Sequence, residues 1–178
     1  MTHPKPGDVV RGFDILSVAE LDEYNAVGVL AKHRSTGCEV YHVVTDDRDN
    51  LFAFAFKTLP EDDSGVAHIL EHSVLCGSKD FPAKDPFLLL LKGSMNTYMN
   101  AFTFPDETVY PASSQVEKDF YNLFRVYGDA VFFPLLRREA FMQEGHRREL
   151  RSDGKLDAVG IVYNEMKGNY SSHDSIAA

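Results

Sequence analysis

The sequence predicts an α+β fold: a two-layer domain with a mostly antiparallel or mixed β-sheet and helices packed on one face. Strand-like segments cluster in the first third of the chain and helix-like segments follow, without the alternation of a βαβ fold. The chain has 178 residues and is 44% hydrophobic, with 13 Phe and 8 Tyr. That length and apolar content suit a single domain over residues 1–178 with a real core.

Short apolar segments between turn residues predict the first strands, at 13–18, 26–32 and 39–44. The next segment, 51–57, is apolar on both of its alternating faces. A strand of this kind is expected in the middle of a sheet, covered on both sides.

The hydrophobic period changes after residue 65. A helix is expected over 66–76, ended by Gly77. A second helix is expected to begin at Asp85 and Pro86, as cap and first-turn residue, and to run to Gly93.

The remaining elements follow in chain order. Further strands are expected at 94–103, 108–112, 147–150 and 159–162. Helices are expected from a cap at Ser113 or Ser114 up to Pro134, from 136 to 144, and from 164 to 170.

Composition argues against several classes of function. Acidic residues outnumber basic ones 27 to 18, giving a formal charge of −9, which disfavours a nucleic-acid partner. No apolar run approaches the roughly 20 residues that span a bilayer, and no signal or transit peptide is visible at the start of the chain. The two cysteines cannot form a disulfide framework. We therefore expect a cytoplasmic protein without a membrane partner; the alternative is a processed organellar protein, whose sequence would look the same.

The segment His68-Ile69-Leu70-Glu71-His72 is the sharpest chemical feature. Residues four apart on a helix share a face, with Cβ atoms about 5–6 Å apart, so both imidazoles can occupy corners of a zinc tetrahedron. Glu71 lies nearly on the same face, where a carboxylate can take a proton from a zinc-held water. This is the inverted zincin pattern HxxEH.

A solvated polar face on a surface helix is the alternative, and chance produces the pattern in about 2% of chains with this composition. The apolar neighbours Val66, Ile69 and Val74 argue against it. They predict a largely buried helix, in which imidazoles and a carboxylate need partners.

A catalytic zinc needs a third protein ligand and one open position. Glu165, at the start of the last expected helix, is the first candidate, although a first-turn glutamate is also explained by the helix dipole. The other candidates are Asp157, Glu144 and His146.

Other metal-binding residue types are interpreted as structural. Cys76 lies one helical turn after His72 and is assigned to packing, as free cysteines often are. The remaining histidines lack a partner pattern: His3, His33, His42, His146 and His173.

Longer segments extend the HxxEH signature. They are HILEHSVLCGS, KDPFLLLLKGSMNTYMNAFTFPDETVYPASS, KDFYNL followed by VYGDAVFFP, EGH, and GIVYNEMKG. In order and spacing, from about residue 13 to the end of the chain, they resemble the pitrilysin or insulinase family (M16) of zinc metallopeptidases, and within it the presequence protease branch.

The resemblance implies a zinc-dependent endopeptidase that degrades short unfolded peptides. It implies one zinc ion per chain, held by His68, His72 and Glu165, with Glu71 as the general base that activates the water.

The resemblance also implies a substrate-binding edge strand at Asn100, Ala101 and Phe102. An open strand edge offers N–H and C=O groups to an extended peptide. From propensity alone, this stretch is equally an ordinary sheet strand.

Members of this branch are much longer, and their second half supplies groups that bind the substrate near the zinc. The chain is therefore expected to be an incomplete N-terminal zinc-binding domain, truncated at its C-terminal end, with the missing C-terminal domains as partners. We expect little activity from it alone, and self-association through exposed apolar surface.

The alternative function is a catalytically inactive relative that serves as a structural or substrate-binding subunit, and a third is a domain with a purely structural metal. The joint presence of His68, Glu71, His72 and Glu165 favours the enzyme.

Overall fold

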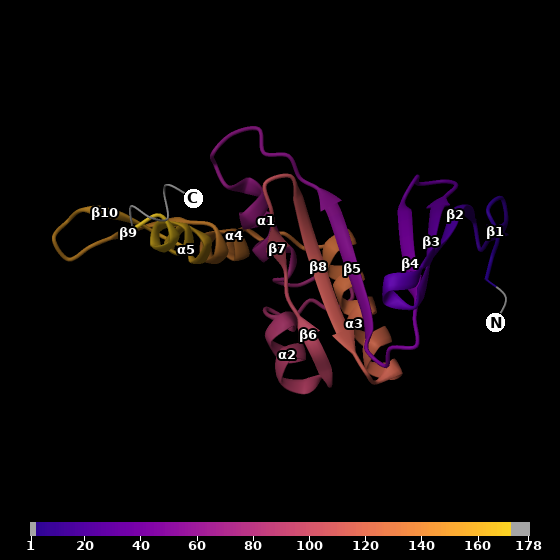
Figure 1. The fold of residues 1–178 in the computed structure, drawn as a ribbon. Coiled ribbons are helices and arrows are strands. Elements are labelled where there is room, and N and C mark those ends of the chain that lie inside the picture. Colours follow the sequence, from indigo (N-terminus) through magenta and orange to yellow (C-terminus); the bar gives the residue numbers. More distant parts are fainter. Residues whose placement is uncertain (1–2, 172–178) are drawn as a thin grey trace. The chain divides into compact units, whose positions relative to one another are not determined.

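The computed structural model describes residues 3–171 (Figure 1). Contacts between Cα atoms divide the chain into two compact units, residues 1–48 and residues 49–178, and each unit is described by itself. Antiparallel sheets and five α-helices make up the described residues, which confirms the α+β class. That both units belong to a single domain stays a prediction.

The first unit is an antiparallel sheet in which the strands follow one another in chain order. The strands are β1 (Val9–Val10), β2 (Phe13–Leu21), β3 (Ala26–His33) and β4 (Glu39–Val44), with the 3₁₀ helix η1 (Asp22–Tyr24) between β2 and β3. Ile15, Val29 and Ala31 form its small buried core. The three strands predicted for this part of the chain are confirmed.

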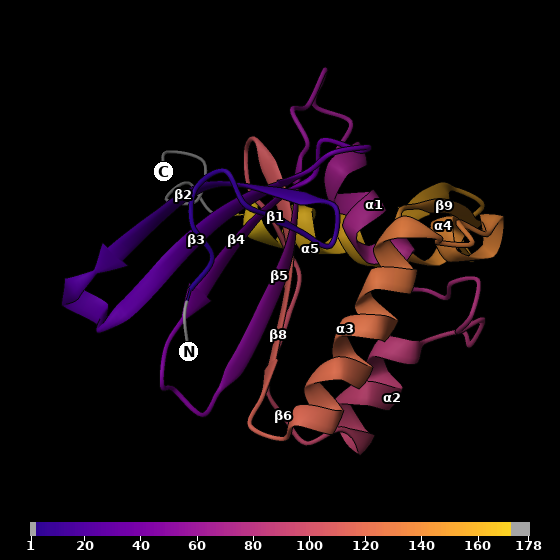
Figure 2. The same ribbon diagram turned by 90° about the vertical axis from the view of Figure 1, so that its right-hand side faces the viewer.

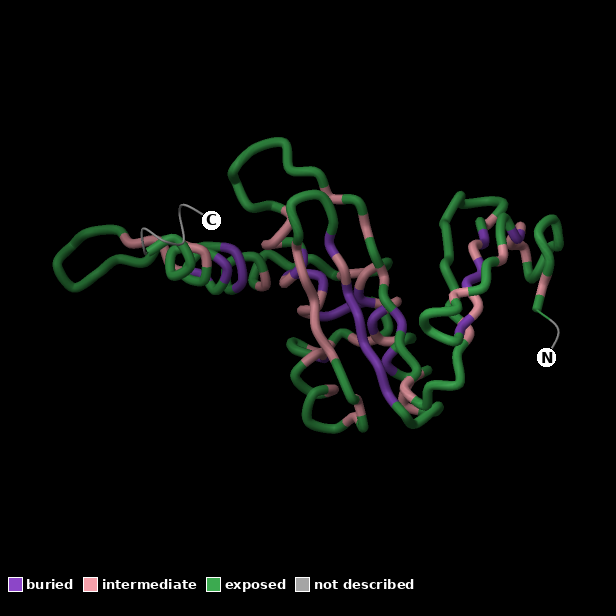
Figure 3. The backbone as a smooth tube through the Cα atoms, viewed as in Figure 1, coloured by how far each residue is buried: buried purple, intermediate pink, exposed green. Residues whose placement is uncertain are grey.

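A second antiparallel sheet organises the other unit. Its strands are β5 (Asn50–Lys57), β6 (Asn96–Met99), β7 (Phe102–Thr103) and β8 (Glu107–Ser114). The order is β5-β8-β6, and β7 also pairs with β8, so β8 lies in the middle and the β6–β7 segment forms an outer edge. Most buried residues of this sheet lie along β8 (Figure 3).

The expectation that 51–57 lies inside a sheet and is covered on both sides was wrong. Within the described residues, β5 pairs with β8 alone. Phe52 is buried, whereas Leu51 on the opposite face is 63% exposed and Ala53 and Ala55 are exposed too. Phe52, Phe54 and Phe56 alternate with Ala53 and Ala55, so one covered face takes the three large aromatic side chains and the other face carries mainly small ones.

Three helices lie on one side of this sheet: α1 (Val66–Val74), α2 (Pro86–Gly93) and α3 (Glu117–Phe132) (Figure 2). From α3, Leu123 and Tyr127 are almost fully buried and pack with Phe52 of β5. This confirms the two-layer prediction for the second unit. No helix in the described part of the chain is long and apolar enough to cross a membrane.

The helix starts were predicted with mixed success. Asp85 caps α2 as expected, because its carboxylate accepts a hydrogen bond from the Leu88 amide at 2.8 Å. The caps predicted for α3 were wrong: Ser113 and Ser114 are the last two residues of β8, and α3 begins after Val116. Ser114 still accepts from the Val116 amide at 3.2 Å, so its hydroxyl supports the turn between the two elements.

The last elements are α4 (Arg138–Glu144), the antiparallel hairpin of β9 (Arg147–Leu150) and β10 (Leu156–Val159), and α5 (Ile161–Asn169). The strand predicted at 159–162 was misplaced, because the chain leaves β10 at Val159 and enters α5 at Ile161. The residue between them is Gly160, whose backbone passes so close to Gly145 that a Cβ atom there would overlap the Gly145 carbonyl. This close approach brings α5 beside α4 and α1.

Candidate metal centre

Helix α1 carries its polar residues toward the protein interior. Glu71 is only 7% exposed, whereas Val66 is 64% exposed and Leu70 is 41% exposed. The sequence analysis predicted a largely buried helix. That prediction holds for Glu71, whereas Val66 and Leu70 face solvent. A carboxylate placed inward in this way needs partners, because burial disfavours an unpaired charge.

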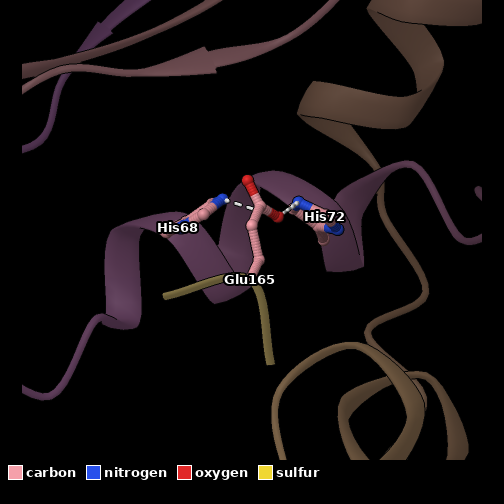
Figure 4. A group of neighbouring side chains, drawn as sticks. All are labelled: His68, His72 and Glu165. Atoms are coloured by element: carbon pink, nitrogen blue, oxygen red, sulfur yellow. Dashed lines mark ion pairs between the residues drawn. The ribbon is translucent and has the colours of Figure 1, made fainter. Parts of the chain in front are cut away.

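Two histidines of α1 and one glutamate of α5 point toward one another (Figure 4). The Glu165 Oε2 atom lies 3.8 Å from His68 Nε2 and 3.7 Å from His72 Nε2. All three ligand atoms lie within 4.8 Å of one another. These separations are too long for hydrogen bonds, and they approach the edge of about 3.3 Å that a tetrahedron with 2.0–2.1 Å bonds would have.

The structure brings only Glu165 of the four predicted candidates into this cluster. Asp157 lies in β10, 3.8 Å from Arg151, and the exposed His146 meets the ring of Phe141 in an edge-to-face contact. The sequence signal for Glu165 was weak because its place beside the two histidines depends on the tertiary packing of α5 against α1, which no local pattern encodes.

Glu144, another of these candidates, has a different position. It is buried, and its Oε2 atom lies 3.1 Å from His72 Nδ1, on the far side of the imidazole from Glu165. Its Oε1 atom accepts a hydrogen bond from Gln143 at 2.9 Å. When Nδ1 of His72 carries the proton and donates it to Glu144, the lone pair of Nε2 is directed at the cluster. This is the common carboxylate–histidine arrangement behind a metal ligand.

The hydrogen bond between His72 and Glu144 also changes the pKa values of both side chains. It raises the pKa of His72, with burial acting in the opposite direction and the charges of Glu71, Glu144 and Glu165 adding to the rise. The same bond lowers the pKa of Glu144. A metal ion must therefore compete with a proton that His72 holds more firmly than a free imidazole does.

The donor set fits zinc. Two imidazole nitrogens and one carboxylate oxygen are a ligand combination found in catalytic zinc sites, which keep a fourth position open. The Glu165 side chain is 46% exposed, so water has access to that position. Cys76 is outside the cluster, with its Sγ atom 3.5 Å from the carbonyl oxygen of His72.

Glu71 does not belong to the ligand cluster, and its carboxylate has a neighbour from the sheet. Its Oε2 atom accepts a hydrogen bond of 2.6 Å from the hydroxyl of Thr103, at the end of β7. Burial first, and the charge of Glu71 second, raise the pKa of Tyr110 in β8, so that hydroxyl stays protonated beside the carboxylate. The sequence places Thr103 at the end of the stretch that resembles a substrate-binding edge strand, but it does not predict the contact with Glu71, which lies 32 residues away.

The predicted substrate-binding residues lie at the outer edge of the sheet. Asn100 and Ala101 separate β6 from β7, and Phe102 is the first residue of β7. The Asn100 side chain is used internally: its Oδ1 atom accepts from the Ala101 amide at 3.0 Å, and its Nδ2 atom donates to the Tyr98 hydroxyl at 3.3 Å.

Of the other histidines, His33 lies 2.8 Å from the Thr36 hydroxyl. His173 lies outside the described residues.

Comparison with protein families finds a match to the family described as Insulinase (Peptidase family M16), over residues 59–153. The matched range contains His68, Glu71, His72 and Glu144, and Glu165 lies beyond it.

Curated relatives match almost the whole chain. Presequence protease 1, chloroplastic/mitochondrial, of Arabidopsis thaliana is 49% identical over 168 residues, which cover 93% of this chain and 16% of that protein. Presequence protease, mitochondrial, of Xenopus tropicalis is 46% identical over 175 residues, 96% of this chain and 17% of that protein. The chain thus spans about one-sixth of the length of these relatives.

Among solved structures, a crystal structure of pitrilysin superimposes with a TM-score of 0.62 and 25% sequence identity. The superposition covers 72% of this chain and 14% of that one.

Proposed function

The chain belongs to the insulinase family, peptidase family M16, and from this membership we propose that it carries the zinc site of an endopeptidase. The proposed substrates are short unfolded peptides of the presequence type. The names of the relatives, which are presequence proteases, support this substrate class.

The observation that carries the proposal is the convergence of His68 Nε2, His72 Nε2 and Glu165 Oε2 from two helices. The three atoms point at one place without hydrogen-bonding to each other, and Glu71 extends from the same helix as the two histidines. A bound zinc ion would lower the pKa of a coordinated water toward about 7 and polarise the peptide carbonyl.

The residues of the chain would then act as follows. Glu71 accepts a proton from the attacking water and passes it to the amine that leaves. Glu144 holds His72 in the tautomer that ligates. The edge formed by Asn100, Ala101 and Phe102 binds the main chain of an extended peptide, as open strand edges do.

The test separates metal binding from catalysis. In the complete protein that contains this sequence, we expect one zinc ion per chain and cleavage of unfolded peptides. The variant Glu71→Gln should keep its zinc and lose about 10²–10⁴-fold in kcat, which is the usual contribution of a general base. His68→Ala should lose the zinc itself, and Glu139→Gln, on the exposed side of α4, should change neither.

Wild-type turnover by Glu71→Gln would contradict the assigned base. Zinc binding without any turnover in the complete protein would favour the alternative of a structural or substrate-binding subunit. For the 178-residue chain by itself we expect zinc binding with little turnover, since Glu165 is open to solvent and water is not excluded from the site.

A further inference from the structure

Side chains along the β6–β7 segment alternate between two faces. Met99 and Ala101 pack against the apolar core of the second unit, and Thr103, two residues further, continues this row. Phe102 and Phe104 fall on the other face, where their rings stack with centroids 5.8 Å apart. Thr103 is therefore the residue of the core-facing row that meets α1.

The contact that Thr103 makes is a charge-assisted hydrogen bond. Its 2.6 Å separation from Glu71 Oε2 is in the range of about 2.5–2.7 Å that hydroxyl–carboxylate bonds occupy. Valine has nearly the same shape as threonine and an equal preference for strands. Packing alone would therefore be satisfied without the hydroxyl, and the hydroxyl serves the carboxylate of Glu71.

We propose that Thr103 is a positioning residue for Glu71: its hydroxyl holds Oε2 and directs Oε1 toward the water that attacks the peptide. The inference rests on the function proposed above. Thr103 directly follows Asn100, Ala101 and Phe102, so the strand that would bind the peptide and the support of the base are one segment of chain. The same segment then sets both the register of the bound peptide and the position of the Glu71 carboxylate relative to it.

The proton balance of the step leaves Thr103 unchanged. Water gives a proton to Glu71 Oε1 while its oxygen bonds to the carbonyl carbon of the peptide. The C–N bond then breaks, and the proton returns from Glu71 to the leaving nitrogen. The hydroxyl proton of Thr103 remains on Thr103 as the donor to Oε2.

The kinetic test uses Thr103→Val in the zinc-loaded complete protein that contains this sequence. We expect kcat to fall about 10–100-fold, since a small misplacement of a catalytic group costs up to about that much. KM and zinc stoichiometry should stay unchanged, and Thr103→Ser should restore kcat to within a few-fold. Thr58→Val is the matched control, because Thr58 also uses its hydroxyl in a hydrogen bond, to Thr108 at 2.7 Å, and its kcat should equal that of the wild type.

A second measurement needs no substrate. Urea unfolding of the wild type, Thr103→Val, Glu71→Ala and the double variant gives a double-mutant cycle. The double variant should lose less free energy of unfolding than the two single variants lose together. Additive losses would show that the hydroxyl and the carboxylate do not interact in solution and would overturn the proposal. Wild-type kcat in Thr103→Val would overturn it too, whereas complete inactivity of the unmutated protein would overturn the proposed function and the role of Thr103 with it.

Discussion

The two ring nitrogens of His72 face different carboxylates. Glu144 lies 3.1 Å from Nδ1, and Glu165 lies 3.7 Å from Nε2. The first contact is a hydrogen bond between nearly buried atoms, and the second is a distance that a shared metal ion would explain. Glu144 thus determines which nitrogen is free to ligate.

Removal of Glu144 should weaken zinc binding without removing a ligand. We expect Glu144→Ala to raise the zinc dissociation constant about 10–100-fold, the usual effect of losing a partner behind a metal-bound histidine. Competition with a chromophoric chelator measures it. Glu139→Ala, at an exposed position on the same helix, is the control, and an unchanged constant in Glu144→Ala would contradict this assignment.

The environment of Cys76 predicts an unreactive thiol. Burial, together with the charge of Glu144, raises its pKa to about 12. A raised pKa keeps the protonated form, so at pH 8 only about one thiol in 10⁴ is the nucleophilic thiolate. We expect iodoacetamide at pH 8 to modify the exposed Cys38 and to spare Cys76, with the rate at Cys76 rising about tenfold per pH unit.

Mass spectrometry of the two cysteine peptides measures this difference. In urea the burial is lost, and both residues should be modified. Equal modification of Cys38 and Cys76 in the folded chain would contradict the raised pKa of the half-buried Cys76.

At the residue scale, sequence distance separates what could be predicted from what could not. His68, Glu71 and His72 share one helical turn, so helix geometry alone brings them together. Glu144 meets His72 across 72 residues, and Thr103 meets Glu71 across 32. No local pattern encodes such contacts, because they depend on how α4 and β7 pack against α1.

At the element scale, the same distinction holds. The bounds of β4 and β9 were predicted correctly, since alternating or turn-bounded segments determine them locally. The start of α5 was predicted three residues too late, because the apolar residues 159–162 suit a strand as well as a helix. The close approach of Gly160 to Gly145, a tertiary contact, ends β10 there.

Gly160 should therefore control the metal site from a distance. In Gly160→Ala the new methyl group would overlap the Gly145 carbonyl, so α5 must shift and carry Glu165 away from the two histidines. We expect zinc affinity to fall by about tenfold or more, measured by chelator competition.

Gly168→Ala provides the matched control on the same helix. A Cβ atom at Gly168 would meet nothing within 4 Å, and alanine favours a helix by roughly 0.5–1 kcal/mol over glycine. Zinc affinity should be unchanged and the urea midpoint slightly higher. Wild-type zinc affinity in Gly160→Ala would show that the Gly160–Gly145 contact does not position α5.

At the scale of the whole molecule, the metal site belongs to one unit. His68, His72 and Glu165 all lie within residues 49–178. From the residues alone, Glu165 was the first of four candidates for the third ligand and only weakly favoured, because it lies far along the chain from His72; the family resemblance made the assignment specific.

The outer surface of the second unit predicts self-association. Leu88 and Leu91 are three residues apart on one face of α2, with Leu89 beside them, and the three are 44%, 45% and 64% exposed. Single exposed leucines are normal, but a contiguous group is typical of an interaction surface. We expect the mean mass from light scattering to rise with concentration as two copies bury these side chains together.

The variant Leu89→Glu should reduce this rise in mass, because burying an unpaired charge is costly. Lys92→Glu on the same helix leaves the leucines intact and should preserve the rise. A constant monomer mass for the unmutated chain would show that this face remains in water.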